Sequence, residues 1–120
     1  MDEVLICAAK RIKENGLHRG SYAVDVNGEN TNNWDDPQAV SWCMEGAVML
    51  CAKIEYGSTT YRKAWWHEDK IKEELEDRFP DIQHDMELNE DYSRLVPYFN
   101  DKVCEGADEA VEILEAAARR

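Results

Sequence analysis

Apolar side chains recur at intervals of three and four residues in several stretches of this 120-residue chain, and this spacing predicts a mainly helical fold. The clearest stretch covers residues 2 to 15 and is followed by Gly16, a residue typical of a helix end. Its apolar stripe consists of Val4, Leu5, Ala8, Ala9 and Ile12. Since most charged residues of the stretch lie off this stripe, we expect an amphipathic helix with one face in the core.

A second helix is predicted to run from Asp36-Pro37 to about Tyr56, because an aspartate caps free amides and proline is tolerated at the first helical position. Gly57 would end it. The face expected to be buried carries Val40, Cys43, Met44, Ala47, Cys51 and Ile54. Gly46 within this helix costs roughly 1 kcal/mol relative to alanine. We therefore expect another helix to pack closely against Gly46 and Ala47.

A third helix is predicted to begin near Ser58 or Thr59 and to end before Pro80, and a fourth to span residues 107 to 119. Residues 21 to 26 alternate in polarity before Asn27-Gly28, which is compatible with a small hairpin.

Residues 29 to 33 are expected to be loop, and residues 80 to 105 to be irregular, with one short helix or strand near Leu95-Val96. We therefore predict one compact domain over residues 1–120, a bundle of about four helices.

The net charge of −12 is concentrated in residues 68 to 91, which hold 11 acidic and 3 basic side chains, a net charge of −8. An acidic surface repels nucleic acids and anionic membranes, so neither is expected as a direct partner. A protein with a basic surface is the expected partner. Its expected binding residues share the outer face of the third helix and are Trp66, Asp69, Glu73, Glu76 and Asp77.

The opposite stripe of the third helix is expected to be buried and carries Tyr61, Ala64, Trp65, Ile71, Leu75 and Phe79. Glu68 also falls on this stripe, which indicates a break in the pattern around it. Two interpretations of Trp66 and its carboxylates remain open. They form either a solvated helix face or a docking surface in which the indole anchors a basic partner.

The four cysteines, at positions 7, 43, 51 and 104, lack C-x-x-C spacing, and we expect all of them to be free thiols. Cys43 is a candidate nucleophile together with a histidine and Asp101, although burial on an apolar stripe would raise its pKa and favours a packing role. Asn100-Asp101 is expected to bond local amides in a turn. No metal site and no cofactor are expected, because neither ligand spacing nor a phosphate-binding loop is present.

The N-terminal residues lack the features of a secretory signal, and no apolar run is long enough to span a bilayer, so a soluble, cytoplasmic protein is expected.

Residues 42 to 47, Trp-Cys-Met-Glu-Gly-Ala, with Asn100-Asp101 and the closing helix, resemble a family of small bacterial and phage proteins catalogued as a domain of unknown function. In that family a Trp-Cys-x-x-Gly-Ala helix follows an N-terminal helix and a glycine-containing turn, and a Trp-Asn-Asp turn precedes the last helix. Phe99 replaces the tryptophan here, and residues 58 to 91 have no counterpart. The resemblance implies an order of structural motifs, built here on Trp42, Cys43, Gly46, Ala47, Asn100 and Asp101, but no activity.

The leading hypothesis is an acidic, non-enzymatic protein-binding module. Its sharpest form is a phage-encoded inhibitor that masks a basic, nucleic-acid-binding surface of a host protein in the host cytoplasm. The alternatives are a small cysteine-dependent enzyme that uses Cys43, a histidine and Asp101, and a dimerising structural protein.

Overall fold

The computed structural model describes residues 1–57 and 61–120. Its helices are α1 (Glu3–Asn15), α2 (Met44–Tyr56), α3 (Tyr61–Arg78), α4 (Ile82–Glu87), α5 (Leu95–Tyr98) and α6 (Ala107–Ala118), with a π-helical turn η1 (Phe99–Val103). Three short strands, β1 (Ala23–Asp25), β2 (Asn30–Thr31) and β3 (Ala39–Trp42), form one sheet. The mainly helical prediction is confirmed, but six helices within the described ranges and a sheet replace the expected bundle of about four helices. The predicted start of the third helix lies outside the described residues.

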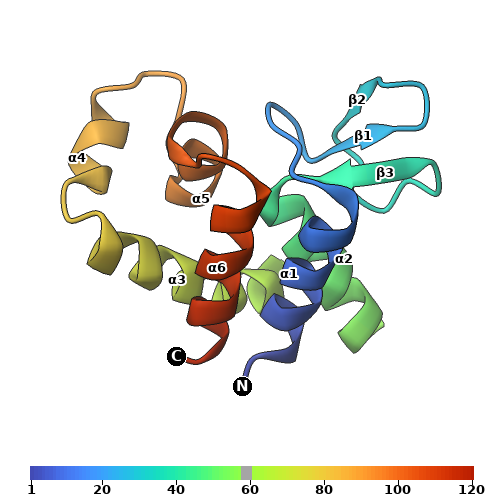
Figure 1. Ribbon diagram of the computed structural model, residues 1–120, viewed down its shortest axis with the longest axis horizontal. Helices are drawn as coiled ribbons and strands as arrows, with labels where there is room; N and C mark the ends of the chain where they lie inside the picture. Colours follow the sequence, from blue (N-terminus) through green and yellow to red (C-terminus); the bar gives the residue numbers. More distant parts are fainter. Residues whose placement is uncertain (58–60) are drawn as a thin grey trace.

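The core is built where α1 packs against α2 and α6, and α6 packs in turn against α3. The sheet lies at one end of this core, while α3 and α4 extend to the opposite side and the two chain ends lie close together (Figure 1). The radius of gyration is 13.3 Å, close to the value of about 13.6 Å expected for a compact chain of this length. The largest fully buried side chains include Leu5, Ile12, Met44, Ile71, Leu75, Phe99, Ile113 and Leu114.

The first helix forms as its sequence pattern predicts. Asp2 caps it, because one carboxylate oxygen accepts hydrogen bonds from the amides of Val4 and Leu5 at 3.0 and 3.1 Å. Gly16, with φ of 85°, ends it in a conformation that favours glycine. The buried residues of α1 are the five of the predicted stripe.

The predicted start of the second helix at Asp36-Pro37 is wrong, because α2 begins at Met44. The Asp36 carboxylate instead accepts a hydrogen bond from the Gln38 amide at 2.9 Å, within a turn. Residues 39 to 42 then pair with β1 as strand β3, with Trp42 opposite Ala23. Strand pairing with a distant segment therefore overrides the local helix-start signal. Val40, on this strand, is 43% exposed, although it was expected to be buried on a helix. Ile54 of α2 was also expected to be buried and is 59% exposed.

The predicted hairpin is confirmed, since β1 and β2 pair in antiparallel fashion. The Asp25 carboxylate accepts hydrogen bonds from the amides of Asn27 and Glu29, both at 2.9 Å, and Gly28 has φ of 77°. Two residues of the expected loop, Asn30 and Thr31, are the strand β2. β1 lies between β2 and β3, so the hairpin is extended by a strand that was predicted to be helix.

Gly46 permits close packing, but its neighbour is not the expected helix. A Cβ atom at Gly46 would lie 2.3 Å from the carbonyl oxygen of Tyr22. This distance is too short for any side chain at that position. The Cys43 amide donates a hydrogen bond to the same oxygen at 3.0 Å. The first turn of α2 therefore rests directly on the backbone that leads into β1, and Ala47 beside it is fully buried.

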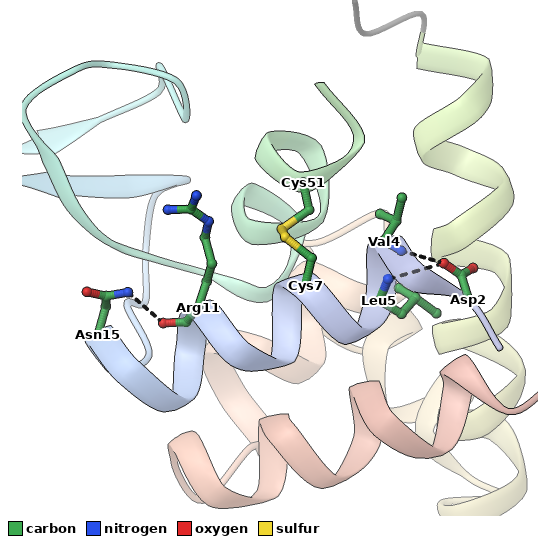
Figure 2. Close-up of a disulfide and its surroundings, with 7 residues drawn as sticks. All are labelled: Asp2, Val4, Leu5, Cys7, Arg11, Asn15 and Cys51. Carbon is green, nitrogen blue, oxygen red and sulfur yellow. Dashed lines mark hydrogen bonds between the residues drawn. A yellow bond between two sulfur atoms is a disulfide. The ribbon is translucent and has the colours of Figure 1, made fainter. Parts of the chain in front are cut away.

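The prediction of four free thiols is wrong, because Cys7 and Cys51 form a disulfide between α1 and α2 (Figure 2). Their Cα atoms are 5.9 Å apart, although the residues are 44 positions apart in the sequence. No local spacing reports such a pair, because only the packing of α1 on α2 brings the two cysteines together. Cys43 and Cys104 are free and buried.

The segment from 80 to 105 is more regular than predicted. The short helix or strand expected near Leu95-Val96 is a helix, α5, whereas α4 was not predicted. Among the helices of the described ranges, none combines the length and the apolar character needed to cross a membrane.

Candidate functional site

The two sequence motifs converge at the N-terminus of α2. The Asn100 side chain is almost fully buried; its oxygen accepts a hydrogen bond from the Met44 amide at 2.8 Å, and its nitrogen donates to the His18 carbonyl at 3.0 Å. The neighbouring Asp101 carboxylate accepts hydrogen bonds from the Gly20 amide at 3.1 Å and the Tyr92 hydroxyl at 2.8 Å. The prediction that Asn100-Asp101 bonds local amides is wrong, because the backbone amides that these side chains accept from are those of the distant residues Met44 and Gly20. The pair is a structural junction of the fold.

Cys43 lines a pocket of about 190 Å³ with Glu45, Arg94 and the Asn100-Asp101 pair. Burial raises the pKa of its thiol to about 12, so the sulfur is protonated at neutral pH. Its Sγ accepts a hydrogen bond from the Gly46 amide at 3.2 Å, which makes Cys43 the N-cap of α2.

Two of the histidines have hydrogen-bond partners other than Cys43. His18 hydrogen-bonds the Ser21 hydroxyl at 2.8 Å, and His67 hydrogen-bonds Asp2 at 2.5 Å. These contacts and the protonated thiol favour a packing and capping role for Cys43. Trp42 beside it is also fixed, since its indole N–H donates to the Trp34 carbonyl at 2.8 Å.

A buried ionic cluster joins α2, α3 and the residue before α5. Glu45 and Glu68 are 3% and 6% exposed, and both contact the guanidinium of Arg94. Arg94 donates to both oxygens of Glu45, one of them at 2.9 Å, and to one oxygen of Glu68 at 3.1 Å. Burial, together with the neighbouring Glu45 carboxylate, raises the pKa of Glu68 to about 9. The position of Glu68 on an apolar stripe was the sequence signal for this cluster. That signal did not identify Glu45 and Arg94 as its partners.

A second pocket, of about 300 Å³, lies between α3, α4 and α5 and is called the α3–α5 pocket here. Its α3 wall carries Trp65, Glu68, Asp69 and Lys72, and its remaining lining includes Met86 of α4 and Arg94 to Val96. Arg94 lines both this pocket and the one beside Cys43.

Trp65 was expected to be buried but is 55% exposed. The core-facing stripe of α3 instead includes His67 and Glu68, whose polar groups are satisfied by Asp2 and Arg94. Trp65 lies on the flank of that stripe, since successive helical residues are about 100° apart. The expected burial of Tyr61 concerns a side chain outside the part that the structure describes.

The predicted binding face of α3 is exposed, but cations of the same chain neutralise part of it. Trp66 is 58% exposed, and the Lys70 ammonium lies 4.1 Å from its ring centroid. Arg120 pairs with Glu73 at 3.7 Å and also with Asp77, and Glu76 lies 3.8 Å from Lys72. Asp69, by contrast, faces the α3–α5 pocket. The structure therefore does not bring the five predicted binding residues together as one uniform acidic surface.

Sequence reasoning missed a buried polar chain at the N-terminus of α1. The ring of His67, 2% exposed, bonds the Asp2 carboxylate through Nδ1 and the Tyr56 hydroxyl through Nε2 at 2.9 Å. Lys70 approaches the same carboxylate at 3.2 Å. Burial alone would raise the pKa of Asp2, but the hydrogen bonds from His67 and the Leu5 amide outweigh it and lower the pKa. These hydrogen bonds and the contact of Lys70 tie α1 to α2 and α3.

Fold and site together describe an acidic, mainly helical protein in which buried polar groups connect the elements. Within the described residues, no group of histidine, cysteine and acidic side chains is arranged to hold a metal ion. The chain belongs to the family described as "Family of unknown function (DUF6197)", which matches residues 1–120. The resemblance to a family of unknown function is thereby confirmed, but the expectation that residues 58 to 91 have no counterpart in the family is wrong, because the match covers the whole chain. No curated protein and no solved structure matches the chain.

Proposed function

We propose that this protein is an acidic, non-enzymatic protein-binding module whose α3–α5 pocket takes a basic segment of a partner protein. The observation that carries the proposal is the position of Trp65 and Asp69, which line the same pocket. An indole offers a large apolar surface and attracts lysine and arginine side chains through its ring face. A carboxylate beside it supplies the opposite charge, so the pair suits an extended basic side chain.

The charge distribution supports the same partner class. Both α3 and α4, which form two walls of the pocket, lie within residues 68 to 91 or overlap them, and this segment has 11 acidic and 3 basic side chains. Such a field steers a basic partner toward the pocket and speeds association. Glu73, Glu76 and Asp77 contribute mainly to this field, because each already contacts a cation of the chain. The Trp66 ring is already covered by Lys70.

A basic surface that otherwise binds nucleic acid is the partner that this module suits best. Carboxylates four residues apart on a helix repeat about every 6 Å, a spacing similar to that of successive phosphates. The protein would then act as an inhibitor that occupies the nucleic-acid site of its partner. A phage-encoded inhibitor of a host protein is the form of this function that we favour.

The proposal is tested with immobilised wild-type protein and a Trp65→Ala, Asp69→Asn double variant as baits. Glu115→Gln, which removes an exposed carboxylate on α6, is the matched control for charge. Basic proteins retained by the wild type and by the control should be lost from the double variant. The purified partner should bind the double variant at least tenfold more weakly, because truncating a central aromatic contact costs about 2 kcal/mol or more.

Binding should also weaken as salt is raised, since exposed charges are screened. Urea unfolding of each bait checks that the substitutions leave the fold intact. Equal retention of the same partner by the wild type and the double variant would refute the proposed surface. Retention of this chain itself as the main partner would favour the dimerising alternative.

The cellular location is a separate question. The proposed action on a host protein places the module in the cytoplasm, but disulfides persist mainly in oxidising compartments. The Cys7–Cys51 bond therefore weighs against a reducing location. Rapid acid quenching of cells, thiol alkylation and mass spectrometry would decide this point. Cys7 and Cys51 alkylated without reductant would support the cytoplasm, and protected cysteines would contradict it.

A further inference from the structure

The cluster of Glu45, Glu68 and Arg94 has an unbalanced charge if both carboxyl groups are ionised. The two carboxylates and one guanidinium would leave a net negative charge, although Glu45 and Glu68 are 3% and 6% exposed. An uncompensated buried charge is strongly unfavourable.

The groups that face the cluster from neighbouring elements do not supply a second cation. They are the Tyr22 hydroxyl before β1, Cys43 at the start of α2, Asp69 and Lys72 of α3, and Asp101 of η1. Two of these add negative charge. The one lysine, Lys72, lies 3.8 Å from Glu76 and pairs with it. Within the part of the chain that the structure describes, a proton is therefore the remaining way to balance the charge.

The hydrogen bonds indicate where that proton resides. One oxygen of Glu68 accepts from Arg94 at 3.1 Å, whereas Oε1 is buried and, among the described residues, meets no donor. An unsatisfied buried oxygen is rare and costly. Protonation makes the Glu68 carboxyl group a donor, and the Glu45 carboxylate, which accepts from the same guanidinium nitrogen and interacts with Glu68, is its acceptor.

We propose that Glu45 and Glu68 share one proton at neutral pH and form a carboxylic acid–carboxylate pair beneath Arg94 that ties α2 to α3. The pair acts as a pH-sensitive connection, because loss of the proton leaves two buried carboxylates in repulsion. Since Glu68 and Arg94 also line the α3–α5 pocket, the same event changes the charge of its wall. The shared proton does not depend on what that pocket binds.

The pH range follows from the pKa of Glu68, which burial raises from 4.5 to about 9. Between these values the folded protein holds a proton that the unfolded chain has released. The stabilisation is therefore complete below the unfolded pKa and declines as pH rises toward the folded pKa. Because the folded state binds one more proton over this range, each unit of increase in pH lowers the folding equilibrium constant by up to tenfold.

The test combines carbon NMR titration of the glutamate side-chain carboxyls with urea unfolding at a series of pH values. One glutamate of the wild type should titrate well above neutral pH, and its signal should be absent from Glu68→Gln. The glutamine amide imitates the protonated acid, because it donates to Glu45 and accepts from Arg94. Glu68→Gln should therefore fold, and its stability should lose the decline that the wild type shows above neutral pH.

Glu76→Gln, on the same helix but exposed, is the matched control. It should retain both the glutamate that titrates above neutral pH and the decline in stability above neutral pH. If Glu68→Gln fails to fold, the wild type still decides the matter through the infrared C=O band of a protonated carboxylic acid at neutral pH. Presence of that band supports the shared proton. Titration of every glutamate in the ordinary acidic range overturns it.

Discussion

Breaking the Cys7–Cys51 disulfide should destabilise this protein severely without changing its fold. The bond links α1 to α2 and closes a loop with a sequence separation of 44 residues. In the chain-entropy account, the loss of that constraint in the unfolded state corresponds to about 4 kcal/mol for a loop of this size. Typical domains have only about 5 to 15 kcal/mol of total stability, so reduction should remove a large fraction of it.

The corresponding change in melting temperature can be worked out from the chain length. With an unfolding entropy of about 2.1 cal/mol/K per residue, a loss of 4 kcal/mol lowers the melting temperature by roughly 16 °C. The assay is urea and thermal unfolding with and without a phosphine reductant, followed by circular dichroism. Cys7→Ala, Cys51→Ala should melt near the reduced wild type, with a small further loss because Cys51 is only 1% exposed.

The control is the response of the double variant to reductant. Its unfolding midpoint should not move, since Cys43 and Cys104 are free thiols. A shift in the wild type of less than about 1 kcal/mol would refute the reasoning, because a 44-residue separation cannot then be the dominant constraint. Alkylation of four cysteines in the unfolded, unreduced protein would show that the bond is absent.

Three further substitutions or reactions test the junction at the start of α2. Gly46→Ala should lower the stability to urea by about 3 kcal/mol, because the added Cβ overlaps the Tyr22 carbonyl oxygen at 2.3 Å; unchanged stability would mean that this approach is not tight. Asn100→Ala should cost about 2 to 3 kcal/mol in the same assay, since it leaves the buried Met44 amide without its acceptor. Asn100→Asp keeps that acceptor but replaces the donor to His18 and Asp101 with a buried carboxylate oxygen, so it should lose at least as much stability. Cys43, with its pKa raised to about 12, should react with iodoacetamide only as fast as the protein opens, and rapid labelling of the native protein would return a nucleophilic role to consideration.

The elements predicted correctly are those whose determinants are close in sequence. The apolar stripe of α1 repeats within 13 residues, and both of its ends are set by the adjacent Asp2 and Gly16. The turn between β1 and β2 likewise depends on Asp25 and Gly28 within a few residues. Helical period, capping and turn formation are short-range effects, so a single sequence reports them directly.

The candidate site was only partly predictable for the opposite reason. Trp66 and the acidic residues could be placed on an outer face of α3 from helical periodicity, and Glu68 was recognised as out of place on the buried stripe. Its partner Arg94 lies 26 residues further on, and the Asn100 side chain bonds an amide 56 residues earlier. Sequence spacing carries no information on such pairs.

The amino-acid sequence by itself determined the helical class, the ends of α1, the hairpin turn and the concentration of acidic charge, because these depend on neighbouring residues. Tertiary structure decided that residues 39 to 42 form a strand, that Cys7 meets Cys51, and that two buried carboxyl groups share Arg94. Each of these outcomes depends on contacts between segments far apart in the chain. The free energy of packing selects such contacts, and it overrides local preference wherever the two disagree, as it does at Asp36-Pro37.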